Sequence, residues 1–206
     1  MAHFAPEYSL LHFCGMEPMQ IAELTSALCC LLSVWLNTKR RPEGWPIGLV
    51  SVVLAGLVYY DAKLLAECAL QLFYLISGIY GWRQWLKSAS SESEKQVSAL
   101  LLSRREAVFG LLYAAVGSVL IWFVLRQIPE AGSPLADALL TGFSLLAQFW
   151  LARRRLENWL LWMAINFGSV LLYLHRELWF FAVLYLLLFM LAVRGYIAWK
   201  KTLKAC

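Results

Sequence analysis

Long apolar segments separated by short clusters of charged residues dominate this sequence of 206 residues. Of these residues, 61% are hydrophobic and 15% are charged, whereas soluble domains carry about 25% charged residues. A chain of this length is too short to bury so much apolar surface in a core of its own. A lipid bilayer explains the pattern, because a charged side chain is costly at the centre of the bilayer and tolerated at its surface.

The apolar segments are long enough to predict an all-α integral membrane protein with seven transmembrane helices. A helix needs about 20 predominantly apolar residues to cross the hydrocarbon. The segments that meet this need within a few residues are 19–36, 45–60, 64–85, 107–125, 134–151, 159–174 and 178–199.

The distribution of Lys and Arg predicts the orientation. When alternate loops are assigned to one side of the membrane, 15 of the 18 Lys and Arg residues collect there, and Lys63, Arg126 and Arg176 lie on the other side. Cytoplasmic loops carry such an excess. We therefore expect residues 1–18 to form an extracytoplasmic tail and residues 201–206 a cytoplasmic tail. Membrane insertion also accounts for the net charge of +5 without a nucleic-acid partner.

The chain resembles itself at long range. VWLNTKRRPEGWPIGLVSVVLAGLVYY and FWLARRRLENWLLWMAINFGSVLLY both contain an apolar helix end, a basic turn, an acidic residue, a Trp and a second helix. When the alignment allows the two basic turns to differ in length by one residue of slack, a constant offset of 114 residues pairs Trp45 with Trp159 and Gly81 with Gly195. This similarity predicts two three-helix repeats, residues 19–86 and 134–200.

The fourth segment determines how the two repeats are related. Three helices end on the opposite side of the membrane from where they began, so a second copy directly after them would be inverted. A cytoplasmic linker at residues 87–105 and a linker helix at residues 106–126 restore the direction. The predicted arrangement is therefore a 3+1+3 parallel repeat, and such repeats place a substrate site between the halves near the midplane.

The sixth segment contains the most informative side chains. Trp159, Trp162 and Asn166 are spaced i, i+3 and i+7, which places them on one face of a helix. Two indole rings and an amide at this depth suit a flat aromatic ligand, and a cationic ring gains further from the aromatic faces. The alternatives are that Trp159 anchors the helix at the interface and that Asn166 bonds a neighbouring helix.

The third segment supplies a second polar face, made of Glu67, Gln71 and Tyr74. The repeat pairs Gln71 with Tyr185, so we expect these two side chains to approach each other across the ligand site. Gln71 is also compatible with an interhelical hydrogen bond, and Glu67 with a position at the interface.

The other polar residues do not indicate a catalytic site. We interpret Glu23, Asn37 and Gln148 as structural. The sequence contains no HExxH, GxSxG or phosphate-binding loop, and its five cysteines lack metal-ligand spacing. We therefore expect no enzyme activity, no cofactor and no metal.

Three stretches together resemble the PnuC family of bacterial vitamin transporters. They are GWPIGLVS, LQLFYLISGIYGWRQW and ENWLLWMAIN, and the resemblance extends over residues from about 22 to 200. The WxxWxxxN element of the family is matched here by Trp159, Trp162 and Asn166. The resemblance implies a multi-pass protein of the bacterial inner membrane, in contact with lipid, whose two three-helix bundles are related to those of SWEET sugar transporters.

The resemblance also implies a function. Members of the family import nicotinamide riboside by facilitated diffusion, and a separate cytosolic kinase retains it; relatives carry thiamine or riboflavin, and the assembly is a homotrimer. The intact WxxWxxxN favours the riboside, but thiamine stays open, because both ligands contain a flat cationic ring. A phosphorylated nucleotide fits poorly, since no Lys or Arg lies in the middle of a span. A membrane scaffold without transport activity is the alternative from another class.

Overall fold

The computed structural model describes residues 17–62, 65–89, 97–127 and 133–203, and these contain seven α-helices. Their ends lie within a few residues of the predicted segments. The helices are α1 (Pro18–Thr38), α2 (Gly44–Asp61), α3 (Leu65–Ala89), α4 (Arg104–Leu125), α5 (Pro134–Ala152), α6 (Asn158–His175) and α7 (Trp179–Leu203).

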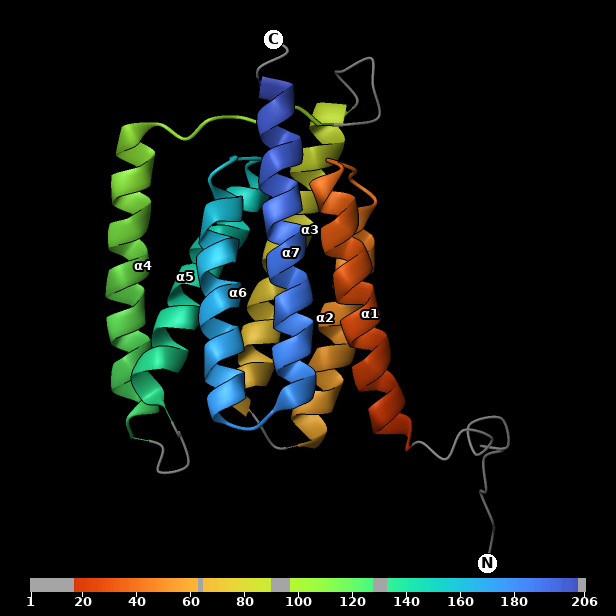
Figure 1. The fold of residues 1–206 in the computed structure, drawn as a ribbon, viewed down its shortest axis with the longest axis vertical. Coiled ribbons are helices and arrows are strands. Elements are labelled where there is room, and N and C mark those ends of the chain that lie inside the picture. The colour runs from red at the N-terminus through yellow and green to blue at the C-terminus, as the bar shows by residue number, and fades with distance from the viewer. Residues whose placement is uncertain (1–16, 63–64, 90–96, 128–132, 204–206) are drawn as a thin grey trace, which may run out of the picture.

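Six of the helices form a closed ring. Each is in contact with two others, in the order α1, α2, α3, α5, α6, α7 and back to α1. The fourth helix, α4, stands outside the ring and packs against α5 (Figure 1). Its outward face is apolar, with Tyr113 and Val124 exposed over 76% and 64% of their surfaces. Such a face suits contact with lipid.

The helices confirm the prediction of an all-α membrane protein. Among the described residues, five helices are long and apolar enough to cross a membrane: α1, α2, α4, α5 and α7. The sequences of α3 and α6 are more polar, and they include Gln71 and Asn166. Figure 1 shows all seven side by side, with neighbours in sequence running in opposite directions. Helices α1 and α5 therefore run the same way, although seven complete crossings remain a prediction.

The ends of the helices recur at a fixed spacing of 114 residues. Adding 114 to the bounds of α2 (44–61) gives those of α6 (158–175), and the same step takes α3 (65–89) to α7 (179–203). Helices α1 and α5 end at Thr38 and Ala152, which are also 114 residues apart.

The basic turns keep this spacing, so the predicted slack of one residue is wrong. Arg40 and Arg154, 114 residues apart, both adopt a left-handed conformation, with φ of 59° and 61°. The N–H of Arg40 donates to the carbonyl of Asn37, and that of Arg154 donates to the carbonyl of Leu151. Similar side chains, such as Trp35 and Trp150, suggested the slack, but the backbone hydrogen bonds show that they occupy different positions.

Four buried tryptophans pack together at the end of the bundle where the basic turns lie. This tryptophan cluster consists of Trp45, Trp85, Trp159 and Trp199, none more than 4% exposed. Ring centroids are 5.5 Å apart between Trp45 and Trp85, 5.8 Å between Trp85 and Trp199, and 5.5 Å between Trp159 and Trp199. The cluster therefore continues from α2 and α3 to α6 and α7.

Glycines make room for two of these rings. Any side chain at Gly81 would overlap the ring of Trp45, and one at Gly195 would overlap the ring of Trp159. The two glycines are 114 residues apart, as are the two tryptophans. Close packing of a helix backbone against an indole is therefore present in α3 and again in α7.

Candidate ligand-binding cavity

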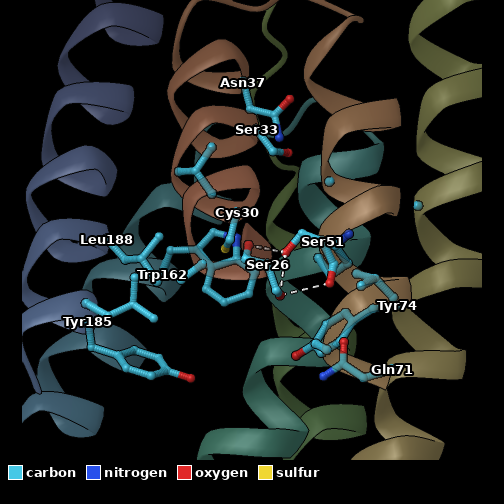
Figure 2. Close-up of a pocket in the computed structure, with 18 of the residues that line it drawn as sticks. Ser26, Cys30, Ser33, Asn37, Ser51, Gln71, Tyr74, Trp162, Tyr185 and Leu188 are labelled. Carbon is cyan, nitrogen blue, oxygen red and sulfur yellow. Dashed lines mark hydrogen bonds between the residues drawn. The ribbon is translucent and has the colours of Figure 1, made fainter. Parts of the chain in front are cut away.

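The six-helix ring encloses a cavity of about 310 Å³ (Figure 2). All six helices of the ring contribute to its wall, and α4 does not. Trp45 and Trp159 line the end of the cavity next to the basic turns, which we call the inner end. Residues at the opposite end, which we call the outer end, include Glu23 and Phe180 and are partly or largely exposed. The described structure is thus more tightly closed at the inner end.

The structure brings six of the seven predicted site residues to this cavity. Glu67 is the exception, because it is exposed near the start of α3 and does not belong to the wall. The six that line the cavity are Gln71, Tyr74, Trp159, Trp162, Asn166 and Tyr185.

Trp162 and Asn166 extend into the cavity from α6. Trp162 is partly buried and lies near the centre of the view in Figure 2. Asn166 is 4% exposed and lies one helical turn further along the same face. An indole face and an amide are therefore available side by side.

Trp159 has different surroundings. It is 1% exposed, and its ring packs against Gly195 and edge-on against Trp199. It belongs to the tryptophan cluster and forms part of the inner end of the cavity. Its ring is therefore held by protein on several sides, unlike that of Trp162.

Gln71 and Tyr185 lie on opposite sides of the cavity, as Figure 2 shows. The ring of Tyr185 is stacked on that of Tyr173, with centroids 5.2 Å apart. Next to Gln71, the hydroxyl of Tyr74 lies 2.6 Å from the hydroxyl of Ser144. This hydrogen bond connects α3 to α5 across one side of the ring.

A polar strip along α1 was not recognised as part of a site in the sequence. Ser26, Cys30, Ser33 and Asn37 all line the cavity. Their spacing of i, i+4, i+7 and i+11 is that of one helical face, and this periodicity was present in the sequence. Asn37 was interpreted as structural because it lies near the helix end.

The hydrogen bonds of this strip also connect α1 to α2. The hydroxyls of Ser26 and Ser51 donate to each other's backbone carbonyl at 2.9 and 2.8 Å. Ser33 donates to the carbonyl of Gly44 at 2.6 Å. Glu23 and Gln148, also interpreted as structural, belong to the cavity wall as well.

The chemistry of the wall favours a flat ligand that carries hydroxyl or amide groups. Aromatic rings come mainly from α6 and α7, and hydroxyls come mainly from α1 and α2. The described wall includes one carboxylate, Glu23, and no lysine or arginine, so a phosphate would meet no positive charge there. In the described part of the chain, no group of His, Cys, Asp and Glu residues is arranged to hold a metal ion.

A protein-family model described as nicotinamide mononucleotide transporter matches residues 20–201. The chain belongs to this family. The match covers all seven helices of the described structure apart from a few residues at the two ends. It confirms the resemblance found in the sequence.

Several characterised relatives of this transporter family are named PnuC. The chain is 23% identical to the nicotinamide riboside transporter PnuC of Escherichia coli strain K12, over 97% of this chain and 94% of the relative. It is 26% identical to PnuC of Neisseria mucosa, over 89% of this chain and 72% of the relative. It is 24% identical to the riboflavin/roseoflavin transporter RibM of Streptomyces davaonensis, over 72% and 70% of the two chains.

A solved structure of a relative has the same fold. The crystal structure of the vitamin B3 transporter PnuC matches with a TM-score of 0.75 and 25% sequence identity, over 98% of this chain and 94% of the other. The chain is therefore a multi-pass membrane protein with the fold of a transporter.

Proposed function

We propose that this chain transports nicotinamide riboside into the bacterial cell across the inner membrane. The observation that carries the proposal is the cavity inside the six-helix ring, whose wall includes Trp162, Asn166 and Gln71. The relatives named nicotinamide riboside transporter support this substrate, because they align with nearly the whole chain.

The proposed topology is a 3+1+3 parallel repeat of seven crossings, with the N-terminus outside and the C-terminus in the cytoplasm. The fixed spacing of 114 residues between helix ends supports the repeat. The common direction of α1 and α5 supports the parallel relation. In this topology the basic turns and the tryptophan cluster face the cytoplasm.

The six predicted site residues that line the cavity each have a proposed role. Trp162 stacks on the pyridinium ring, and Asn166 hydrogen bonds its carboxamide. Gln71 and Tyr74 bind the ribose hydroxyls from one side of the cavity, and Tyr185 binds them from the opposite side. Trp159 closes the inner end, which follows from its burial against Gly195.

The proposed mechanism is facilitated diffusion without an energy source in this chain. The described wall carries a single carboxylate, Glu23, and therefore no series of acidic groups for proton coupling. A cytosolic kinase then retains the substrate as its phosphate. By family resemblance, the assembly in the membrane is a homotrimer.

Thiamine is the second candidate substrate, and riboflavin is the third. Thiamine presents a flat cationic thiazolium to Trp162, as the riboside presents a pyridinium. The similarity to RibM favours testing riboflavin in parallel.

Quenching of tryptophan fluorescence in the purified protein distinguishes these substrates. We expect saturable quenching by nicotinamide riboside and none by thiamine or riboflavin at equal concentration. Because the chain contains ten tryptophans, the signal is assigned with two variants. Trp162→Phe should remove most of the quenching, whereas Trp159→Phe should keep it. Quenching by thiamine alone would identify thiamine as the substrate in place of the riboside. An absence of saturable quenching by any of the three would contradict the proposal.

A further inference from the structure

The segment that leads into α4 crosses the inner end of the bundle. This strap, residues 97–102, passes the end of α7 on its way to the start of α4 (Figure 1). The N–H of Val97 donates to the carbonyl of Arg40 at 3.1 Å, and the N–H of Leu100 donates to the carbonyl of Arg154 at 2.9 Å. Since Arg40 and Arg154 are 114 residues apart, the strap bonds equivalent positions in the two halves.

The strap also covers the tryptophan cluster. Val97 is 0% exposed and Ala99 is 7% exposed, and both pack within the same buried cluster as Trp85 and Trp199. Trp45 and Trp159 line the cavity, whereas Trp85 and Trp199 do not. From the cavity towards the inner surface, the closure therefore consists of one pair of indoles, a second pair, and then the strap.

The strap is bonded to the second half along Leu100, Leu101 and Leu102. On the second half, the N–H of Leu156 donates to the carbonyl of Leu100 at 2.9 Å, and Arg155 donates to the carbonyl of Leu101 at 2.8 Å. The carboxylate of Glu157 accepts the N–H of Leu102 at 3.0 Å.

On the first half, Val97 of the strap is bonded to Arg40. Besides the bond from the Val97 N–H, the guanidinium of Arg40 donates to the carbonyl of Val97 at 3.2 Å. Among the described residues, the strap is thus bonded to the first half at Val97 and to the second half at Leu100, Leu101 and Leu102.

Unpartnered polar groups inside the closure favour a separation of the halves at the inner end. The indole N–H groups of Trp45 and Trp159 are buried and have no hydrogen-bond partner in the described structure. A buried donor without a partner destabilises the state that contains it. Water would reach both groups when the inner end opens.

We propose that the strap is the releasable closure of the cytoplasmic end of the cavity. It stays with the second half and detaches from Arg40 when the cavity opens inwards. This inference rests on the proposed function, because only a transporter needs the inner end to open. The inference adds that a segment outside the cavity controls whether the cavity is open to the cytoplasm.

The native thiol of Cys30, which lines the cavity, reports the opening. In a chain that keeps Cys30 and carries alanine at the other four cysteines, a charged, membrane-impermeant thiol reagent is added to inside-out vesicles. Two variants weaken the attachment: Val97→Pro removes the N–H, and Arg40→Gln removes the guanidinium. We expect either variant to speed labelling about five-fold, the factor for one net hydrogen bond of about 1 kcal/mol.

Matched controls separate the strap from a general loosening of the fold. Leu101→Pro places a proline in the strap where no described residue accepts the N–H, and Arg41→Gln removes an exposed charge from the same turn as Arg40. Both controls should label at the rate of the parent chain. Equal rates in all five proteins would overturn the proposal. It would also be overturned if right-side-out vesicles of the two strap variants showed the same acceleration.

Labelling of Cys30 requires no transported substrate. Uptake of nicotinamide riboside by the parent chain is measured separately in the same vesicles. Loss of the strap effect with intact uptake contradicts this inference alone. Absence of uptake contradicts the proposed function.

Discussion

Trp85 of α3 and Trp199 of α7 lie with their indole centroids 5.8 Å apart, and each donates a hydrogen bond to a helix of the other repeat. The indole N–H of Trp85 donates to the carbonyl of Leu151 in α5 at 3.2 Å. The indole N–H of Trp199 donates to the carbonyl of Asn37 in α1 at 3.1 Å. Donors and acceptors are both 114 residues apart, so the two hydrogen bonds are equivalent.

These bonds make a prediction about stability. Trp85→Phe and Trp199→Phe keep an aromatic ring but remove one of the two hydrogen bonds that each carbonyl accepts, since the N–H groups of Arg154 and Arg40 still donate to them. Each should lower the free energy of unfolding in detergent by about 0.5–1.5 kcal/mol, and by similar amounts. Trp122→Phe in α4, which lies outside the tryptophan cluster, is the control. A difference of several kcal/mol between Trp85→Phe and Trp199→Phe would show that the bonds are not equivalent.

The glycines beneath the indoles give a second prediction. Gly81→Ala and Gly195→Ala force a methyl group into the rings of Trp45 and Trp159, which should destabilise the protein by about 1–3 kcal/mol. Gly117 of α4 has open space where a side chain would stand, so Gly117→Ala should leave stability unchanged or raise it by up to about 1 kcal/mol. Thermal unfolding of the three variants in detergent measures this order, and a Gly117→Ala variant less stable than the others would contradict it.

Transport depends on the face of α6 that points into the cavity. Trp162→Ala or Asn166→Ala should lower uptake of nicotinamide riboside about ten-fold or more, because each change removes about 1.4 kcal/mol or more of binding. The amount of folded protein in the membrane should not change. Trp122→Ala serves as the comparison. Full uptake by the double variant at positions 162 and 166 would favour a scaffold over a transporter.

Gln71 and Glu67 make a matched pair on α3, because both are polar and only Gln71 lines the cavity. Gln71→Leu should raise the KM for uptake about five-fold, as expected from one lost hydrogen bond. Glu67→Gln should leave the KM unchanged. Initial uptake rates over a range of substrate concentrations measure both, and the reverse order would return Glu67 to the site.

The helices, and several of the residues that line the cavity, could be predicted from the sequence. Long apolar runs mark helices, since a backbone in lipid must form its hydrogen bonds within its own segment. The i, i+3, i+7 spacing placed Trp162 and Asn166 on one face, and the structure has that face at the cavity. The same spacing argument predicted Glu67 at the cavity, but Glu67 is exposed. A helical face is wider than the part of it that lines the cavity.

Other features depend on contacts that local periodicity does not contain. The polar strip through Ser26 and Asn37 faces the cavity because α1 packs against both α2 and α7. The predicted alignment of the basic turns is wrong by one residue because it follows similar side chains such as Trp35 and Trp150. The left-handed conformation of Arg40 and Arg154, which is uncommon outside glycine, shows which residues of the two turns are equivalent.

The sequence by itself determined the membrane character and placed the seven helices to within a few residues of their ends, and it predicted the repeat, because these follow from hydrophobicity and similarity along the chain. Only the tertiary structure decided which faces meet, that six helices close into a ring around a cavity, and that residues 97–102 join the two halves. The physical reason is distance along the chain. Contacts such as that of Trp199 with Asn37 join residues that are neighbours only after folding.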